Sequence, residues 1–226
     1  MFTRYAIYYT PAAGTPLAQF GAEWLGWDSA DGRGFDQPTI DGLDMPAITA
    51  PPRKYGFHGT LKPPFRLADG TDADALGKAV AGIAAETAPI VLEGLHMTRL
   101  GRFLALTPFG EVDALAVFAG RLVQDLDGFR APPTEAELAK RRAGGLNPAQ
   151  EVNLVNWGYP YVLDQFRFHL TLTGRLDAAT ADITQAAINE RIASMPLAPY
   201  TMDGVTLLGE DAEGMFHQIH RYALTG

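Results

Sequence analysis

The chain has 226 residues, of which 47% are hydrophobic and 19% charged, and its formal net charge is −8. This balance is typical of a globular domain with a full hydrophobic core. Cysteine is absent, which excludes disulfides and thiolate metal sites. The acidic charge disfavours sequence-independent binding to long DNA or RNA, whereas a small phosphorylated metabolite can still bind where cations cluster locally.

The first residues and the rest of the chain contain no recognisable targeting or membrane signal. The opening MFTRYAIYYTP lacks the apolar run and cleavage site of a signal peptide. No stretch approaches the roughly 18 apolar residues of a membrane span. We therefore expect a soluble, cytoplasmic protein with no membrane partner, and the oligomeric state stays open.

The first third of the chain alternates β-rich and helical patterns. Residues 4–9 predict a strand closed by Thr10-Pro11, and residues 17–27 place apolar side chains at helical spacing. Residues 28–52 are rich in Gly, Pro and Asp and predict a long surface loop. A strand over 55–61 and an Ala-rich helix over 72–87 follow.

The middle of the chain predicts a hairpin and then a helical, charged segment. The hairpin turns near Gly101, and a capping box at Thr134–Glu137 opens the charged helix. The predicted elements are strands over 90–100 and 102–107 and helices over 112–126, 134–142 and 148–157.

The last third repeats the order of the first. A strand over 165–173, a helix over 179–192 and a hairpin over 201–208 and 215–223 mirror the strand, helix and hairpin that begin at Phe57. The two copies start 111 residues apart. Such an internal repeat predicts a duplicated supersecondary unit.

The predicted fold is therefore of the α+β class: a duplicated, two-lobed fold with two antiparallel sheets flanking a central groove and helices on the outside. We expect residues 1–226 to form a single domain, in which the strand at 4–9 joins one of the sheets. Its parts would be lobe one at about 53–128, an inserted helical segment at about 129–164, and lobe two at about 165–226.

Each copy opens with nearly the same five residues, Phe-His-Gly-Thr-Leu at 57–61 and Phe-His-Leu-Thr-Leu at 168–172. Alternate side chains of a strand share a face. His58 and Thr60 should thus face the groove, as should His169 and Thr171, while the Phe and Leu side chains pack beneath the helices. The duplication predicts that two His-Thr pairs meet across one groove.

Two histidines and two threonines suit chemistry at a phosphodiester. A neutral imidazole can take a proton from water while an imidazolium protonates the departing oxygen, and hydroxyls can hold the non-bridging oxygens. We predict His58 and His169 as the catalytic pair and Thr60, Thr171, Lys62 and Arg167 as substrate-binding residues. Lys62 and Arg167 would supply positive charge on the same face.

These motifs resemble the paired His-x-Thr signatures of the two-histidine (2H) phosphoesterase superfamily. The likeness covers almost the whole chain. The chain is similar to one branch of the superfamily, which is associated with phosphonate metabolism. The stretches that carry this similarity are Arg4–Tyr8, Tyr55–Phe65, Phe129–Pro132, Ala136–Ala139 and Gly158–His169. The resemblance implies a LigT-like fold, catalysis by both histidines, and no metal or other cofactor. Gly59 departs from the pattern, where alanine is expected.

Several alternatives stay open. The same fold could bind or sense a phosphorylated metabolite without turnover, and His58 and His169 with a carboxylate could ligate a divalent ion, although no closely spaced motif supports this. Which histidine is the acid is undecided. Arg141 and Arg142 favour a solvated helix face over a lid on the groove, and His217 and His220 are expected on opposite faces of a strand.

Overall fold

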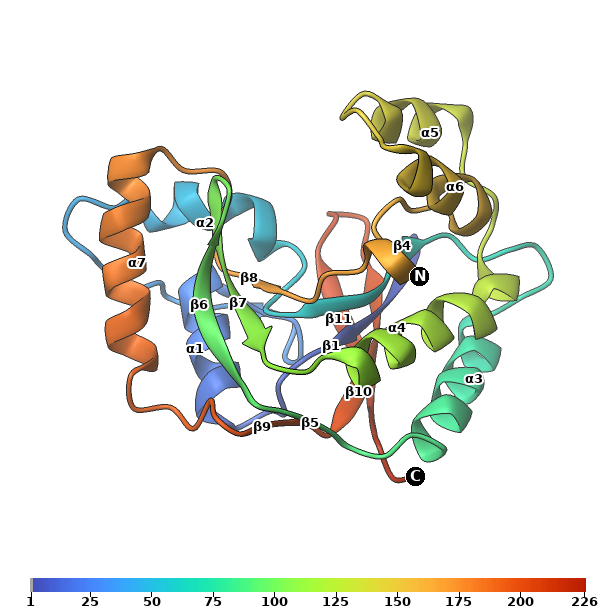
Figure 1. The fold of residues 1–226 in the computed structure, drawn as a ribbon, viewed down its shortest axis with the longest axis horizontal. Helices are drawn as coiled ribbons and strands as arrows, with labels where there is room; N and C mark the ends of the chain where they lie inside the picture. Colours follow the sequence, from blue (N-terminus) through green and yellow to red (C-terminus); the bar gives the residue numbers. More distant parts are fainter. Residues whose placement is uncertain (1) are drawn as a thin grey trace.

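A seven-stranded antiparallel sheet forms the centre of the computed structural model, which describes residues 2–226. The strand order is β11-β10-β1-β4-β8-β7-β6, which confirms the α+β class with antiparallel strands (Figure 1). The strands are β1 Arg4–Tyr9, β4 Gly59–Phe65, β6 Gly94–Leu100, β7 Phe103–Phe109, β8 Leu170–Thr171, β10 Gly204–Glu210 and β11 Phe216–Ala223.

Two small sheets and seven helices complete the part of the chain that the structure describes. The small sheets pair β2 Trp27–Asp28 with β3 Arg33–Gly34, and β5 Ile90–Leu92 with β9 Tyr200–Met202. The helices are α1 Pro16–Leu25, α2 Met45–Arg53, α3 Ala73–Ala85, α4 Asp113–Asp125, α5 Glu135–Arg142, α6 Pro148–Trp157 and α7 Ala178–Ile192, with 3-10 turns at Asp127–Phe129 and Leu163–Gln165. Among residues 2–226, no helix combines the length and apolar character that crossing a membrane requires.

The predicted duplication appears as pairing between equivalent residues. Gly59 of β4 pairs with Leu170 of β8, and these positions lie 111 residues apart. Val91 of β5 pairs with Thr201 of β9, at a separation of 110 residues. Because equivalent residues of the two copies face each other directly, a pseudo-twofold axis passes between the two members of each pair.

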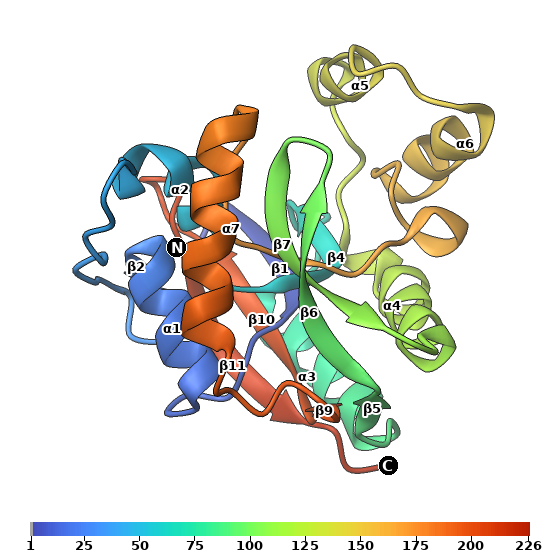
Figure 2. The same ribbon diagram turned by 60° about the vertical axis from the view of Figure 1, so that its left-hand side comes forward.

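The two copies exchange their hairpins across this axis. The first copy's strand β4 lies with β1, β10 and β11, whereas the second copy's strand β8 lies with β7 and β6. The first copy's helix α3 packs on β10 and β11, and α7 packs on β6 and β7 (Figure 2). Each half of the sheet therefore combines parts of both copies, so residues 53–128 and 165–226 intertwine within one sheet.

The main hydrophobic core lies on one face of the sheet, and a small apolar cluster lies on the other. In β1, Tyr5, Ile7 and Tyr9 enter the main core, while Ala6 and Tyr8 join Leu208 and Phe216 in the small cluster. This alternation follows from the two-residue period of a strand. The face of the sheet opposite the main core is therefore partly apolar, and polar side chains can lie against this small cluster.

Most predicted elements are confirmed, including the strand at 4–9, the hairpin turn at Gly101 and the helix expected over 72–87, which forms as Ala73–Ala85. The capping box of α5 is formed by Thr134 and Glu137 as predicted. The inserted segment carries α5 and α6, which project beyond β4 at the upper right of Figure 1.

The loop predicted over 28–52 is wrong in its last part, where α2 forms. The side chain of Asp44 accepts a hydrogen bond from the Ala47 amide, and Pro46 occupies the first turn, where a missing amide hydrogen costs nothing. Pro51 and Pro52 lie inside the helix near its end. The high proline content thus marks the ends of a short helix as well as a loop.

The strand predicted over 165–173 is much shorter in the structure. A 3-10 turn occupies Leu163–Gln165, and β8 spans only Leu170–Thr171. The amides of Leu172 and Thr173 both bond to the carbonyl of Leu104, which interrupts the ladder. Similarly, the strand expected over 55–61 begins at Gly59 and runs to Phe65.

The absence of a side chain at Gly59 is a packing requirement. A Cβ atom there would lie 2.3 Å from the ring of Phe168, whose side chain is 7% exposed. The second motif's phenylalanine thus occupies the space that the alanine expected at position 59 would fill.

We predict that Gly59→Ala lowers the free energy of unfolding by about 1–3 kcal/mol, because the buried Phe168 ring must shift. Gly82→Ala is the matched control: this exposed glycine inside α3 has no atom within 4 Å of its Cβ position. It should stabilise the protein by up to about 1 kcal/mol. Urea unfolding of both variants tests this, and equal stabilities would contradict it.

Candidate active site

The two His-Thr pairs lie on one face where β4 meets β8. Since Gly59 pairs with Leu170 in an antiparallel ladder, the register sets His58 opposite Thr171 and Thr60 opposite His169. Directly opposite side chains are roughly 5 Å apart at Cβ, and diagonal neighbours roughly 7–8 Å. The two histidines thus occupy diagonal corners of a four-residue square.

Burial separates the two faces of both motifs as predicted. His58, Thr60, His169 and Thr171 are half-buried. The flanking apolar residues are buried in the main core, namely Phe57, Leu61, Phe168, Leu170 and Leu172. The sequence alternation therefore holds from 57 to 61 and from 168 to 172.

Each imidazole is oriented by a backbone carbonyl two residues earlier. His58 Nδ1 lies 2.9 Å from the Gly56 oxygen, and His169 Nδ1 lies 2.8 Å from the Arg167 oxygen. A carbonyl only accepts, so Nδ1 of each ring carries the hydrogen and Nε2 is left for other chemistry. In His58, Nε2 is 3.2 Å from the Thr60 hydroxyl.

Aromatic side chains surround His58. The Tyr8 ring stacks on it with centroids 3.9 Å apart, and Tyr55 lies 5.7 Å away. Burial, with a smaller effect from the charge of His169, lowers the pKa of His58 to about 4, against the opposing effect of the Gly56 carbonyl. His58 is therefore neutral at pH 7, with Nε2 able to accept a proton.

A cavity of about 270 Å³ opens over three corners of this square, His58, Thr60 and Thr171. Side chains of β1, β4, β8, α5 and the end of α2 line it, together with the segment after α6. The lining residues are Arg4, Tyr8, Pro51, Pro52, Tyr55, His58, Thr60, Pro63, Pro64, Arg141, Tyr159, Thr171 and Thr173. His169 is outside this lining and adjoins the site through its register with Thr60, beside the ring of Phe103 at 5.8 Å.

Lys62 does not share the face of His58, contrary to prediction. The pairing of β1 with β4 shifts between Tyr8–Thr60 and Ile7–Lys62, and this bulge turns Lys62 toward α4. Its side chain is 2% exposed and its Nζ donates to the Val123 carbonyl at 2.9 Å. Burial lowers the pKa of Lys62 to about 8, and Asp127 opposes this shift.

The side chain of Arg167 also lies outside the cavity lining. Its guanidinium donates to the carbonyl of Phe166 at 2.6 Å, and the residue is exposed. Its contribution to the site is its own carbonyl, which orients His169. Of the six predicted site residues, the structure thus brings together the two histidines and the two threonines.

Other cavity residues were not selected from the sequence, chiefly Arg4, Tyr8, Tyr55, Arg141 and Tyr159. Tyr8 lines the cavity because it pairs with Thr60 in the β1–β4 register, which the sequence alone does not reveal. Arg141 was expected on a solvated helix face. It is exposed as expected, but it also lies over the Tyr159 ring at 4.5 Å and lines the cavity, so the inserted segment does reach the site.

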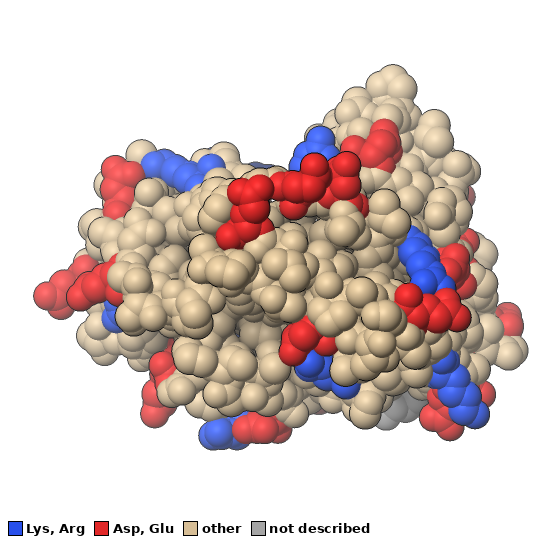
Figure 3. All heavy atoms as spheres, turned by 60° about the horizontal axis from the view of Figure 1, so that its bottom comes forward, with Lys and Arg blue, Asp and Glu red and all other residues tan. Residues whose placement is uncertain are grey.

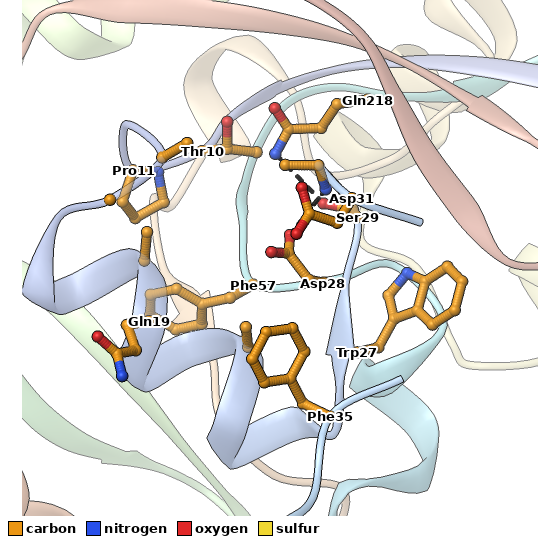
Figure 4. Close-up of a pocket in the computed structure, with 15 residues that line it drawn as sticks. Thr10, Pro11, Gln19, Trp27, Asp28, Ser29, Asp31, Phe35, Phe57 and Gln218 are labelled. Carbon is orange, nitrogen blue, oxygen red and sulfur yellow. Dashed lines mark hydrogen bonds between the residues drawn. The ribbon is translucent and has the colours of Figure 1, made fainter. Parts of the chain in front are cut away.

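A separate hollow of about 310 Å³ lies beside α1. In Figure 4, the rings of Phe35 and Phe57 lie on one side and Asp28, Ser29 and Asp31 on the other. Its lining contains two carboxylates and no lysine or arginine, which does not suit an anion. The histidine cavity, whose lining includes Arg4 and Arg141, is better suited to an anion.

Charged side chains on the outer surface are mixed. On the face in Figure 3, acidic and basic side chains are interspersed with wide uncharged areas. Within residues 2–226, no three His, Asp or Glu side chains gather as a metal ion would require. His217 pairs with Asp211 at 2.6 Å instead of lining the cavity.

The lowered pKa of His58 gives a pH-dependence with a defined sign. Between about 4 in the folded protein and the ordinary 6.5 of the unfolded chain, only the unfolded state binds this proton. The stability that neutral His58 contributes is therefore complete above pH 6.5 and is lost as the pH falls toward 4.

We predict that wild-type protein loses about 2–4 kcal/mol more stability than His58→Gln between pH 7 and pH 4. The variant keeps every other titrating group, so the difference isolates His58. Urea titrations at several pH values measure it. Parallel pH profiles for the two proteins would show that the ring titrates normally.

Three comparisons relate the chain to known proteins. The family model described as "Protein of unknown function (DUF1045)" matches residues 60–217. The chain is 41% identical, over 94% of its length, to "Ribose 1,5-bisphosphate phosphokinase PhnN" of Janthinobacterium sp. (strain Marseille), and 35% identical, over 77%, to the protein of that name from Laribacter hongkongensis (strain HLHK9). It spans only 48% and 40% of those two proteins.

Solved structures that it resembles include E. coli LigT complexed with 3′-AMP, at 15% identity and a TM-score of 0.47 over 100% of both chains. The protein TT0787 of Thermus thermophilus matches at 14% identity and a TM-score of 0.43, over 99% of this chain and 98% of that one. The family match covers well over half of the chain and includes Thr60, His169 and Thr171. The chain therefore belongs to the DUF1045 family.

Proposed function

We propose that this protein is a phosphodiesterase that hydrolyses a small cyclic or linear phosphodiester by acid–base catalysis between His58 and His169. The observation that carries the proposal is the square of two His-Thr pairs at the β4–β8 pair, with each Nδ1 bound to a carbonyl. The cavity over His58, Thr60 and Thr171, of about 270 Å³, has room for a small metabolite.

The surroundings of the two rings favour a different part for each in the proposed reaction. His58 has its pKa lowered to about 4 and is neutral at pH 7, so its Nε2 takes a proton from water as the water oxygen bonds to phosphorus. His169, in its protonated form, gives the Nε2 proton to the departing oxygen as the phosphorus–oxygen bond breaks. A proton then passes from His58 to solvent and another from solvent to His169, which restores both rings.

The other groups of the cavity support the same reaction. The hydroxyls of Thr60 and Thr171 can donate to the non-bridging oxygens and hold phosphorus between the rings. Lys62 is buried under α4, so Arg4 and Arg141 are the cations nearest the substrate in the cavity lining. They can offset the negative charge that grows in the transition state.

The names of the relatives indicate which substrates to test first. Both are named for a kinase of ribose 1,5-bisphosphate, and both are more than twice as long as the matched region. We carry over only the sugar-phosphate chemistry in that name. Ribose cyclic phosphates and nucleoside cyclic phosphates are therefore our leading candidates.

We predict that His58→Gln and His169→Gln each lower kcat by about 10²–10⁴-fold on a cyclic phosphodiester, because each removes one proton transfer. His96→Gln is the matched control, since this exposed histidine lies in the β6–β7 hairpin away from the cavity. Product formation can be followed by phosphorus NMR. Undiminished activity in either catalytic variant would refute the assignment.

We further predict that turnover is insensitive to EDTA, because both proton transfers use side chains alone. The kcat/KM profile should retain its activity on the acid side down to about pH 4, where His58 becomes protonated. A loss of activity as the pH falls through 6.5 in wild-type protein would contradict His58 as the base. Restoration of EDTA-treated enzyme by one divalent ion would instead indicate metal-dependent hydrolysis.

A further inference from the structure

A second hollow adjoins the histidine cavity and is rich in cations. Its volume is about 260 Å³, and it shares Arg4, Tyr55, Pro64 and Arg141 with the lining of the first. Six of the chain's 18 lysines and arginines line it, namely Arg4, Lys54, Arg66, Arg130, Lys140 and Arg141. In a chain of net charge −8, this concentration is unlike the mixed outer surface.

Carboxylates neutralise three of these six cations. Arg4 pairs with Glu210, Arg66 with Glu137 and Arg130 with Asp127. Among these carboxylates, only Glu137 itself lines the hollow.

The other three cations have no carboxylate within 4 Å in the described part of the chain, and they are Lys54, Lys140 and Arg141. Two of them lie over aromatic rings, Lys54 over Tyr55 at 4.7 Å and Arg141 over Tyr159 at 4.5 Å. Ring faces attract cations without neutralising their charge. The hollow therefore keeps about three uncompensated positive charges.

We propose that this hollow binds a phosphomonoester carried by the same small molecule whose phosphodiester lies between the histidines. The inference rests on the proposed function and narrows it to diesters that bear a second, terminal phosphate. A phosphomonoester carries a charge of about −1.5 to −2 at pH 7 and three acceptor oxygens, which matches lysine and arginine donors. The shared lining residues place the two groups on one continuous surface.

The cations come from two walls of the site. Lys54 directly follows α2, and Lys140 and Arg141 lie on α5, a helix with no buried residue. A phosphate bound by Lys54 on one wall and by the cations of α5 on the other would hold α5 in place over the cavity. Binding energy from this remote group can then position the diester at the histidines.

Isothermal titration calorimetry with ribose 5-phosphate tests the subsite without requiring turnover. We expect the double variant Lys54→Gln/Lys140→Gln to weaken binding by about tenfold or more, because two charge-assisted contacts are lost. Lys78→Gln, which removes one exposed lysine charge on α3 away from the hollow, is the control and should bind within about twofold of wild type. Circular dichroism confirms that each variant is folded.

His58→Gln separates the two phosphate positions in the same experiment and should also bind within about twofold of wild type. If His58→Gln loses more affinity for ribose 5-phosphate than the double variant does, the phosphate binds at the histidines and the inference is overturned. No binding by wild type, or wild-type affinity in the double variant, would overturn it too. Each of these results leaves the hydrolysis assay to decide the proposed function by itself.

Turnover gives the second readout. Nucleoside 2′,3′-cyclic phosphates with and without a 5′-phosphate differ only in the terminal group. We expect wild type to favour the 5′-phosphorylated substrate by about tenfold or more in kcat/KM, mainly through KM, and the double variant to lose this preference. Equal kcat/KM values in wild type would refute the phosphomonoester subsite while sustaining the phosphodiesterase.

Discussion

The antiparallel pairing of Gly59 with Leu170 is the constraint on which the site depends. It is the contact that joins the two halves of the seven-stranded sheet through β4 and β8. Because side chains alternate along a strand, a shift of either strand by one residue would turn the His-Thr pair of that strand into the core. The missing side chain at Gly59 leaves space for the Phe168 ring, so packing beneath the sheet supports the register that places the imidazoles above it.

The exchange of hairpins makes the two copies interdependent. Each half of the sheet contains a strand from one copy and a hairpin from the other, while β5 and β9 pair at the crossing. Neither half can be formed from one continuous segment of chain. The symmetric part of the site lies near the pseudo-twofold axis, where the pairing of β4 with β8 holds both His-Thr motifs together.

The asymmetry of the site comes from what surrounds this axis. Tyr8 and Tyr55 enclose His58, whereas His169 adjoins the single ring of Phe103. Burial lowers the pKa of His58 to about 4, which makes two rings in equivalent frames chemically different. The inserted helix α5 brings Arg141 to one side, so positive charge is also distributed unequally.

The sequence by itself determined the α+β class, most helices, the duplication and the four residues of the histidine square. These features depend on local periodicity, capping and repetition, which can be read along the chain. Only the tertiary structure decided the exchange of hairpins, the shortness of β8 and the helix within 28–52. It also decided the positions of two cations. A bulge turns Lys62 away from the face of His58, and α5 places Arg141 in the cavity lining. Bulges and the docking of inserted helices depend on contacts between distant segments, and strand alternation carries no information about them.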